Sequence, residues 1–73
     1  MENYKTVYGS VQIAASEKNI ILYTKNKALG CAEIEQIMQK YINLNPMGGK
    51  QGQNEVQRAE YFDDENVWAA EIM

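Results

Sequence analysis

The sequence of 73 residues contains no histidine, one cysteine, one proline and one arginine. Without histidine, the chain lacks the usual general base near neutral pH and the commonest zinc ligand. A single cysteine, Cys31, excludes an internal disulfide bond. No apolar run approaches the ~20 residues of a membrane-spanning helix, and the N-terminal residues do not resemble a signal peptide. We therefore expect a cytoplasmic protein with no membrane segment, no metal and no cofactor.

The length of the chain allows one domain, over residues 1–73, with a small core. At this size the gain from apolar burial and the loss of conformational entropy nearly cancel, so an isolated subunit should be marginally stable. Small domains usually gain the missing stability from disulfides, a metal or association, and this composition leaves association. We therefore expect a homo-oligomer, most simply a dimer.

The N-terminal third predicts a β-hairpin over residues 4–25. Residues 4–15 and 20–24 are rich in β-branched and aromatic side chains, which favour strands. The segment from Ser16 to Asn19 between them suits a tight turn that ends in a left-handed asparagine.

The C-terminal part predicts a second hairpin over residues 55–73, with strands at 56–62 and 67–73. An acidic turn, residues 63–66, separates two alternating segments, so that Tyr61 lies opposite Trp68 on an apolar face. As a helix, the same residues would scatter their apolar side chains all round, so a pair of strands is the better prediction.

A helix is predicted over residues 28–44, because apolar side chains recur there at three- and four-residue spacings. Asn26 is a candidate N-cap, and Pro46 follows the predicted end. Residues 45–54 hold three glycines and one proline and predict a loop. The order ββαββ predicts an α+β fold, with an antiparallel sheet of two hairpins and one helix packed on one face.

One helix covers only one face of such a sheet, so the other face is left without a partner. If Ala15 lies opposite Ile20, the covered face carries Val7, Val11, Ile13, Ala15, Ile20 and Leu22. The uncovered face then carries Tyr4, Tyr8, Ile21, Tyr23 and Phe62. Aromatic patches with few charges are typical of interface cores, so we expect the dimer interface here. The alternative is an ordinary solvated sheet, on which single exposed tyrosines need no partner.

The formal charge of −3 is distributed unevenly along the chain. Residues 1–54 carry a net +2, whereas residues 55–73 carry a net −5. The acidic hairpin and the glycine-rich loop are therefore candidate partner-binding segments, with contact residues Lys50, Glu60, Asp63, Asp64 and Glu65. A basic or nucleic-acid-binding surface of another protein would complement this charge. The scattered lysines and single arginine do not favour direct nucleic-acid binding.

Three features resemble catalytic or ligand sites but have simpler explanations. Cys31 has no histidine to activate it and suits a small apolar position on the inner face of the helix. Residues 48–52 lack the spacing and the hydroxyl residue of a phosphate-binding loop. The acidic residues 63–65 fall in a turn, where solvation explains their charge. We therefore do not expect an enzyme.

The remaining hypothesis is a small module that binds a partner protein. By analogy of size alone, such a chain matches phage-encoded inhibitors, which occupy a surface of a host protein or nucleoprotein machine. The alternative is a protein that binds a nucleotide-like ligand at an oligomer interface, between aromatic side chains and Lys50. Trp68 belongs to the core or to a contact surface, depending on the register of the second hairpin.

Overall fold

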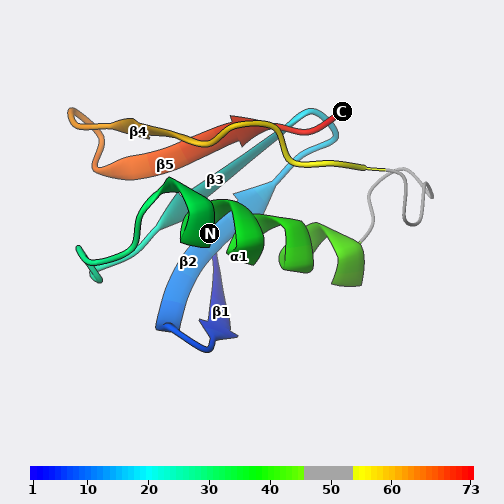
Figure 1. The fold of residues 1–73 in the computed structure, drawn as a ribbon. Coiled ribbons are helices and arrows are strands. Elements are labelled where there is room, and N and C mark those ends of the chain that lie inside the picture. The colour runs from blue at the N-terminus through cyan, green and yellow to red at the C-terminus, as the bar shows by residue number, and fades with distance from the viewer. Residues whose placement is uncertain (46–53) are drawn as a thin grey trace.

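A computed structural model of the protein describes residues 1–45 and 54–73. The strands are β1 (Glu2–Thr6), β2 (Gly9–Ala15), β3 (Asn19–Tyr23), β4 (Glu60–Phe62) and β5 (Val67–Glu71), and the helix is α1 (Cys31–Leu44). The strands form one antiparallel sheet in the order β1-β2-β3-β5-β4. The helix packs across one face of this sheet (Figure 1), which confirms the predicted α+β class.

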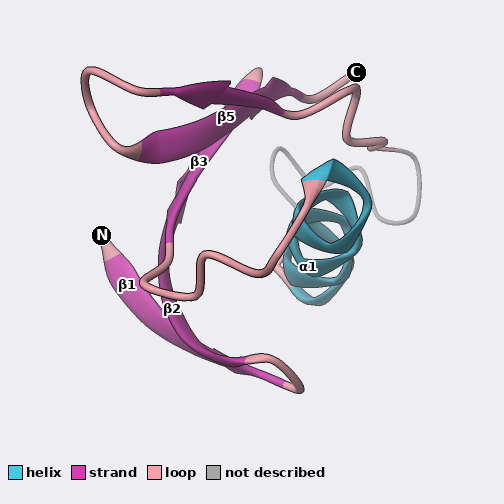
Figure 2. Cartoon of the chain, turned by 60° about the vertical axis from the view of Figure 1, so that its left-hand side comes forward, coloured by secondary structure: helices cyan, strands magenta, loops and turns pink. Residues whose placement is uncertain are grey.

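The sheet curves around α1, as Figure 2 shows, and the β1–β2 turn reaches past one side of the helix. The core lies between the concave face of the sheet and α1. It is built from alternate strand positions and from helix positions three and four apart, the spacings that place side chains on one face. The largest fully buried side chains are Ile13, Ile20, Leu22, Ile34 and Met38.

The predicted first strand is in fact two strands, joined by a tight turn at Val7 and Tyr8. Thr6 pairs with Gly9 across this turn, and Thr6 Oγ1 accepts a hydrogen bond from the Tyr8 N–H (2.9 Å). The Thr6 hydroxyl also donates to the Gly9 carbonyl oxygen (2.7 Å). Gly9 has a φ of 106°, which side chains disfavour. Val7 is 87 % exposed, so its predicted place in the core was wrong.

The second turn closes between β2 and β3 in the predicted register, with Ala15 opposite Ile20. The Ser16 N–H donates to the Asn19 carbonyl oxygen (2.8 Å), and the Asn19 N–H donates to Ser16 Oγ (3.2 Å). The expected left-handed conformation of Asn19 was wrong, because the described non-glycine residues adopt a positive φ only at Asn66.

The second hairpin also has the predicted register, with Tyr61 opposite Trp68. Asn66 has a φ of 57° and its N–H donates to the Phe62 carbonyl oxygen (2.8 Å), as expected for a turn that ends in a left-handed asparagine. Trp68 is half-buried against the core, on the face that α1 covers. β4, which pairs with β5, is shorter than predicted. Before β4, the chain meets the residues that end β5 and follow it through an isolated bridge of Val56 with Ile72 and through backbone hydrogen bonds of Glu55 and Gln57.

The helix begins at Cys31, at the late end of the range from residue 27 to residue 31 that the weakening effect of Gly30 on the first turn predicts. Gly30 is its N-cap, and the Gly30 N–H donates to Glu33 Oε1 (2.8 Å). Asn26, the expected N-cap, instead accepts a hydrogen bond from the Ala28 N–H (2.9 Å) in the turn that precedes the helix. Among residues 1–45 and 54–73, no helix has the length and apolar character needed to cross a bilayer.

The positive φ of Gly9 predicts a specific cost for any larger residue at this position. Space is available, because a Cβ there would meet no heavy atom within 4 Å, so the cost of Gly9→Ala comes from the backbone alone. We expect Gly9→Ala to lower the free energy of unfolding by about 1 kcal/mol. Urea denaturation measures this change, with Ser10→Ala as the control. Equal stability of the two variants would contradict the strained turn.

Candidate functional site

The convex face of the sheet, which α1 does not cover, carries a group of apolar side chains that we call the outer face. Its members are Ala14, Ile21, Tyr23, Phe62, Val67 and Ala69. Ile21 lies opposite Ala14 and Ala69, and its chain neighbours are fully buried on the other side of the sheet. Phe62 lies opposite Val67 at the acidic end. Ile21 and Phe62 are 37 % and 44 % exposed. The predicted residues Ile21, Tyr23 and Phe62 therefore share this face.

Tyr4 and Tyr8 do not lie on the outer face, so their predicted placement was wrong. The reversal of the chain at Val7 and Tyr8 places even-numbered residues of β1 opposite odd-numbered residues of β2. Tyr4 consequently lies opposite the buried Val11 and faces the helix. Its ring meets the ring of Tyr41 edge-on, with centroids 5.2 Å apart and an interplanar angle of 79°.

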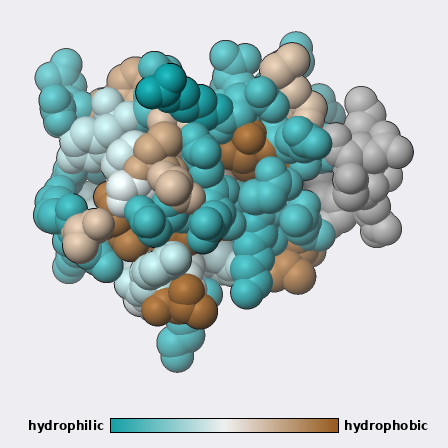
Figure 3. Space-filling view, viewed as in Figure 1, coloured by the Kyte–Doolittle hydropathy of each residue, from teal (hydrophilic) through white to brown (hydrophobic). Residues whose placement is uncertain are grey.

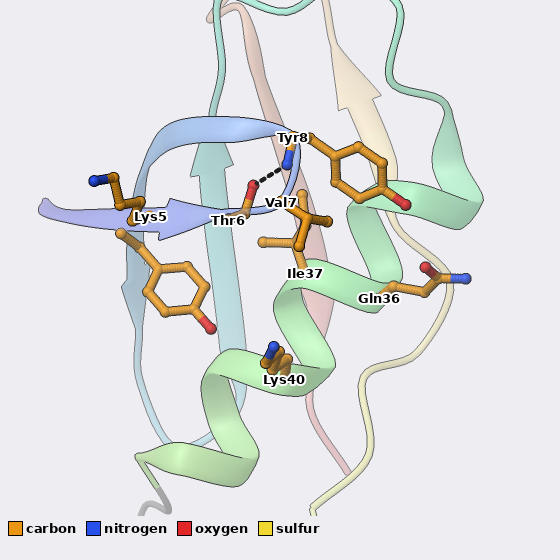
Figure 4. Close-up of a pocket in the computed structure, with 8 residues that line it drawn as sticks. Lys5, Thr6, Val7, Tyr8, Gln36, Ile37 and Lys40 are labelled. Carbon is orange, nitrogen blue, oxygen red and sulfur yellow. Dashed lines mark hydrogen bonds between the residues drawn. The ribbon is translucent and has the colours of Figure 1, made fainter.

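Tyr4 and Tyr8 line a groove between β1 and α1, which we call the β1–α1 groove (Figure 4). The groove has a volume of about 440 Å³. One wall consists of residues 4–8, and the other consists of Gln36, Ile37 and Lys40. The Tyr8 ring extends from the turn toward the helix, whereas the Lys5 side chain points away from it. Figure 3 shows that the molecular surface on this side is mostly hydrophilic, with separate apolar patches.

A hydrogen bond between Tyr41 and Glu2 joins the start of β1 to the last turns of α1. The Tyr41 hydroxyl donates to Glu2 Oε1. This hydrogen bond to a carboxylate, together with burial of the phenol, raises the pKa of Tyr41 to about 12. Because this contact joins β1 to α1 next to the groove, it fixes the distance between the two elements that form the groove walls.

The acidic contact residues predicted for partner binding are at the surface. Asp63, Asp64 and Glu65 are all exposed at the β4–β5 turn, and we call these three residues the acidic tip. Phe62 and Tyr61 precede the tip, and Tyr61 is 40 % exposed. The Tyr61 hydroxyl donates to Asn66 Oδ1, which also accepts a hydrogen bond from Lys27 Nζ (3.0 Å).

The other two predicted contacts stand apart from the acidic tip. Glu60 is exposed on β4, opposite Ala69 on the outer face. Lys50 and most of the predicted loop 45–54 lie outside the described residues. The acidic tip therefore follows two exposed aromatic residues that lie on opposite faces of β4, and Glu60 shares the face of Phe62.

A polar stripe on α1 holds the chain segment that leads into β4, and the sequence analysis missed it. The stripe consists of Cys31, Glu35 and Gln39, which are four residues apart and so lie on one face of the helix. Gln39 donates to the Asn54 carbonyl oxygen (3.0 Å) and accepts from the Val56 N–H (2.9 Å). On its other side the same segment bonds to the end of the chain, where Glu55 and Met73 exchange two hydrogen bonds of 2.8 and 2.9 Å.

The first two members of the stripe bind the backbone of Ala59. Glu35 Oε2 accepts from the Ala59 N–H (2.8 Å), and Cys31 Sγ donates toward Glu35 Oε2 (3.1 Å) and the Ala59 carbonyl oxygen (3.2 Å). The hydrogen bond to Glu35, with burial of the sulfur, raises the pKa of Cys31. The hydrogen bonds from Cys31 and Ala59 lower the pKa of Glu35. Cys31 is thus held as a thiol donor, which opposes a role as a nucleophile.

In the part of the chain that the structure describes, no group of three acidic, cysteine or histidine side chains is placed to hold a metal ion. Comparison with protein-family models, with curated proteins and with solved structures found no match. The outer face, the acidic tip and the β1–α1 groove are thus the surfaces of the described residues that could meet a partner or ligand.

The raised pKa of Tyr41 predicts a loss of stability at alkaline pH. Because the folded pKa of about 12 exceeds the ordinary value of 10.0, the stabilising contribution is complete below pH 10 and disappears as the pH rises toward 12. We expect the wild type to lose more stability over this range than Tyr41→Phe, as measured by urea unfolding. Tyr23→Phe, a matched loss of one hydroxyl, should follow the wild type. A parallel pH dependence of all three proteins would show that Tyr41 is not the cause.

The outer face predicts self-association. We expect light scattering to give the mass of a dimer for the wild type and of a monomer for Ile21→Asp, because a charge at the centre of the face cannot be desolvated without a partner. Ala32→Asp introduces the same charge at an exposed site on α1, on the other side of the sheet, and should remain a dimer. A monomeric wild type would remove the role of the outer face as a dimer interface.

Proposed function

We propose that the protein is a non-enzymatic protein-binding module whose β4–β5 hairpin contacts a basic surface of a partner. The observation that carries this proposal is the exposure of two aromatic rings directly beside the acidic tip, Phe62 on the outer face and Tyr61 on the opposite face of β4. Energetically important interface residues are usually large aromatic side chains surrounded by polar groups that exclude water. The hairpin provides both parts in consecutive residues.

The hairpin is held firmly enough to present these side chains. β5 pairs with β3 in the middle of the sheet, and β4 pairs with β5. Trp68 contacts the Tyr61 ring, with centroids 5.2 Å apart, and Asn66 receives the Tyr61 hydroxyl and the Lys27 ammonium. Little ordering entropy is therefore lost when a partner binds, which favours affinity.

The charge of the hairpin selects the class of partner. Residues 55–73 carry a net −5, and the acidic tip concentrates three of these charges at one turn. A surface that a protein normally uses to hold nucleic acid has the complementary charge, and opposite charges accelerate the encounter. Occupation of such a surface would block its normal ligand, so the module would act as an inhibitor of the phage-encoded type.

The test uses the immobilised protein and extracts of its source cell, with three variants. The neutralised tip (Asp63→Asn with Asp64→Asn and Glu65→Gln) and Phe62→Ala should each lose most of the captured partner. Glu17→Gln, an exposed carboxylate in the β2–β3 turn, is the matched control and should retain it. A short duplex DNA should displace the partner, because both compete for one basic surface.

Two results would contradict the proposal. The first is a partner that the neutralised tip retains as well as the wild type does. The second is a partner lost equally with Glu17→Gln, which would indicate non-specific charge attraction. Circular dichroism of each variant establishes that the loss of binding is not a loss of folding.

A further inference from the structure

The two margins of the sheet differ in what lies beside them. The strand order places β1 and β4 at the ends of the sheet. The segment before β4 is bonded on one side to the end of the chain and on the other to Gln39 and Glu35 of the helix. β1 pairs only with β2 among the described strands. Alternate residues of an antiparallel edge strand direct their N–H and C=O groups away from the neighbouring strand, so β1 offers unused backbone groups.

The β1–α1 groove runs along this edge of β1. Its wall includes the consecutive residues Tyr4, Lys5 and Thr6, although the side chains of neighbouring strand residues point to opposite faces. A hollow that touches consecutive residues borders the strand edge itself. The opposite wall is helical and carries the apolar Ile37, with Lys40 about one helical turn further along (Figure 4). A groove that borders an open strand edge is the kind of site at which an extended peptide binds by strand addition.

The charge around the groove indicates which peptide fits. Lys5 and Lys40 are both exposed, and the lining residues include no carboxylate. Lys5 lies opposite Ser10 and so belongs to the convex side of the sheet, whereas Tyr4 and Ile37 face the concave side. A strand added beside β1 would place alternate side chains against these two sides. Apolar side chains suit Tyr4 and Ile37 on the concave side, and acidic side chains suit Lys5 on the convex side, while Lys40 adds positive charge at the helical wall.

We propose that the β1–α1 groove binds an extended acidic segment of a partner protein, which adds to the sheet as a strand beside β1. A second copy of the chain, joined edge to edge through β1, is a poorer occupant because it would bring the two Lys5 side chains together. The groove is a second binding site, separate from the β4–β5 hairpin, and this inference does not rest on the function proposed for that hairpin.

The test uses fluorescently labelled heptapeptides that alternate valine with glutamate, titrated with the full chain and followed by anisotropy. The acidic peptide should bind saturably, and a peptide with lysine in place of glutamate should not. An acidic peptide with N-methylated backbone amides should also lose binding, because strand addition needs its N–H groups. Nuclear magnetic resonance should place the largest amide shifts in residues 4–8.

Charge variants of the protein complete the test. Lys5→Glu and Lys40→Glu should each weaken binding about tenfold, because reversal replaces an attraction with a repulsion. Lys18→Glu, an exposed lysine of the β2–β3 turn, should bind as the wild type does. Phe62→Ala should also bind the peptide normally, so failure here and failure of the proposed hairpin function are distinguishable.

Three outcomes would overturn the proposal. One is equal binding of the acidic and basic peptides, and another is equal weakening by Lys18→Glu and Lys40→Glu. The third is thermal stabilisation by ADP or ATP with no binding of the acidic peptide. That result would make the groove a nucleotide site lined by Tyr4, Tyr8 and Lys40.

Discussion

The structure depends on one helix, α1, which is the only cover that residues 1–45 and 54–73 provide for a five-stranded sheet. Its apolar stripe supplies five of the thirteen buried apolar side chains, but a stripe about 100° wide cannot cover a flat sheet of this size. The sheet therefore curves around it (Figure 2). Polar contacts on both sides of the stripe hold the two margins, through Tyr41 and Glu2 at β1 and through Glu35 and Gln39 beside the segment that precedes β4.

These contacts have different energetic roles. The buried apolar side chains supply most of the driving force, as expected for the hydrophobic effect. The hydrogen bonds contribute less, but each satisfies a backbone or side-chain group that would otherwise be costly to bury. Glu35 and Gln39 act toward residues 54–59 as a neighbouring strand would, because they accept from N–H groups and donate to a carbonyl oxygen. On the other side of this segment, Glu55 and Gln57 form backbone hydrogen bonds with Met73 and Glu71 at the end of the chain.

Much of the fold was predictable from the sequence because its signals are local and periodic. The helix stripe and the alternation around the second and third turns determine which side chains are buried, and both hairpin registers follow from that alternation. The turn at Val7 and Tyr8 was missed because both residue types favour strands, and only Gly9 marks the reversal. That turn places the residues before it on the opposite face of the sheet from the predicted one. Tyr4, and Tyr8 in the turn itself, therefore line the groove and do not belong to the predicted interface.

The polar stripe of α1 could not be predicted with the same rules, because its partners are backbone groups far away in the sequence. The spacing of Cys31, Glu35 and Gln39 was a visible signal, but such spacing is equally common on solvated helix faces. Because the polar stripe binds the segment before β4, the two margins of the sheet differ in what lies beside them. One margin is occupied by the protein's own helix and chain end, and the other has a basic groove along an open strand. If both proposed sites bind partners, the opposite charges of the acidic tip and of Lys5 and Lys40 would select different ones, because a basic partner of the tip would be repelled at the groove.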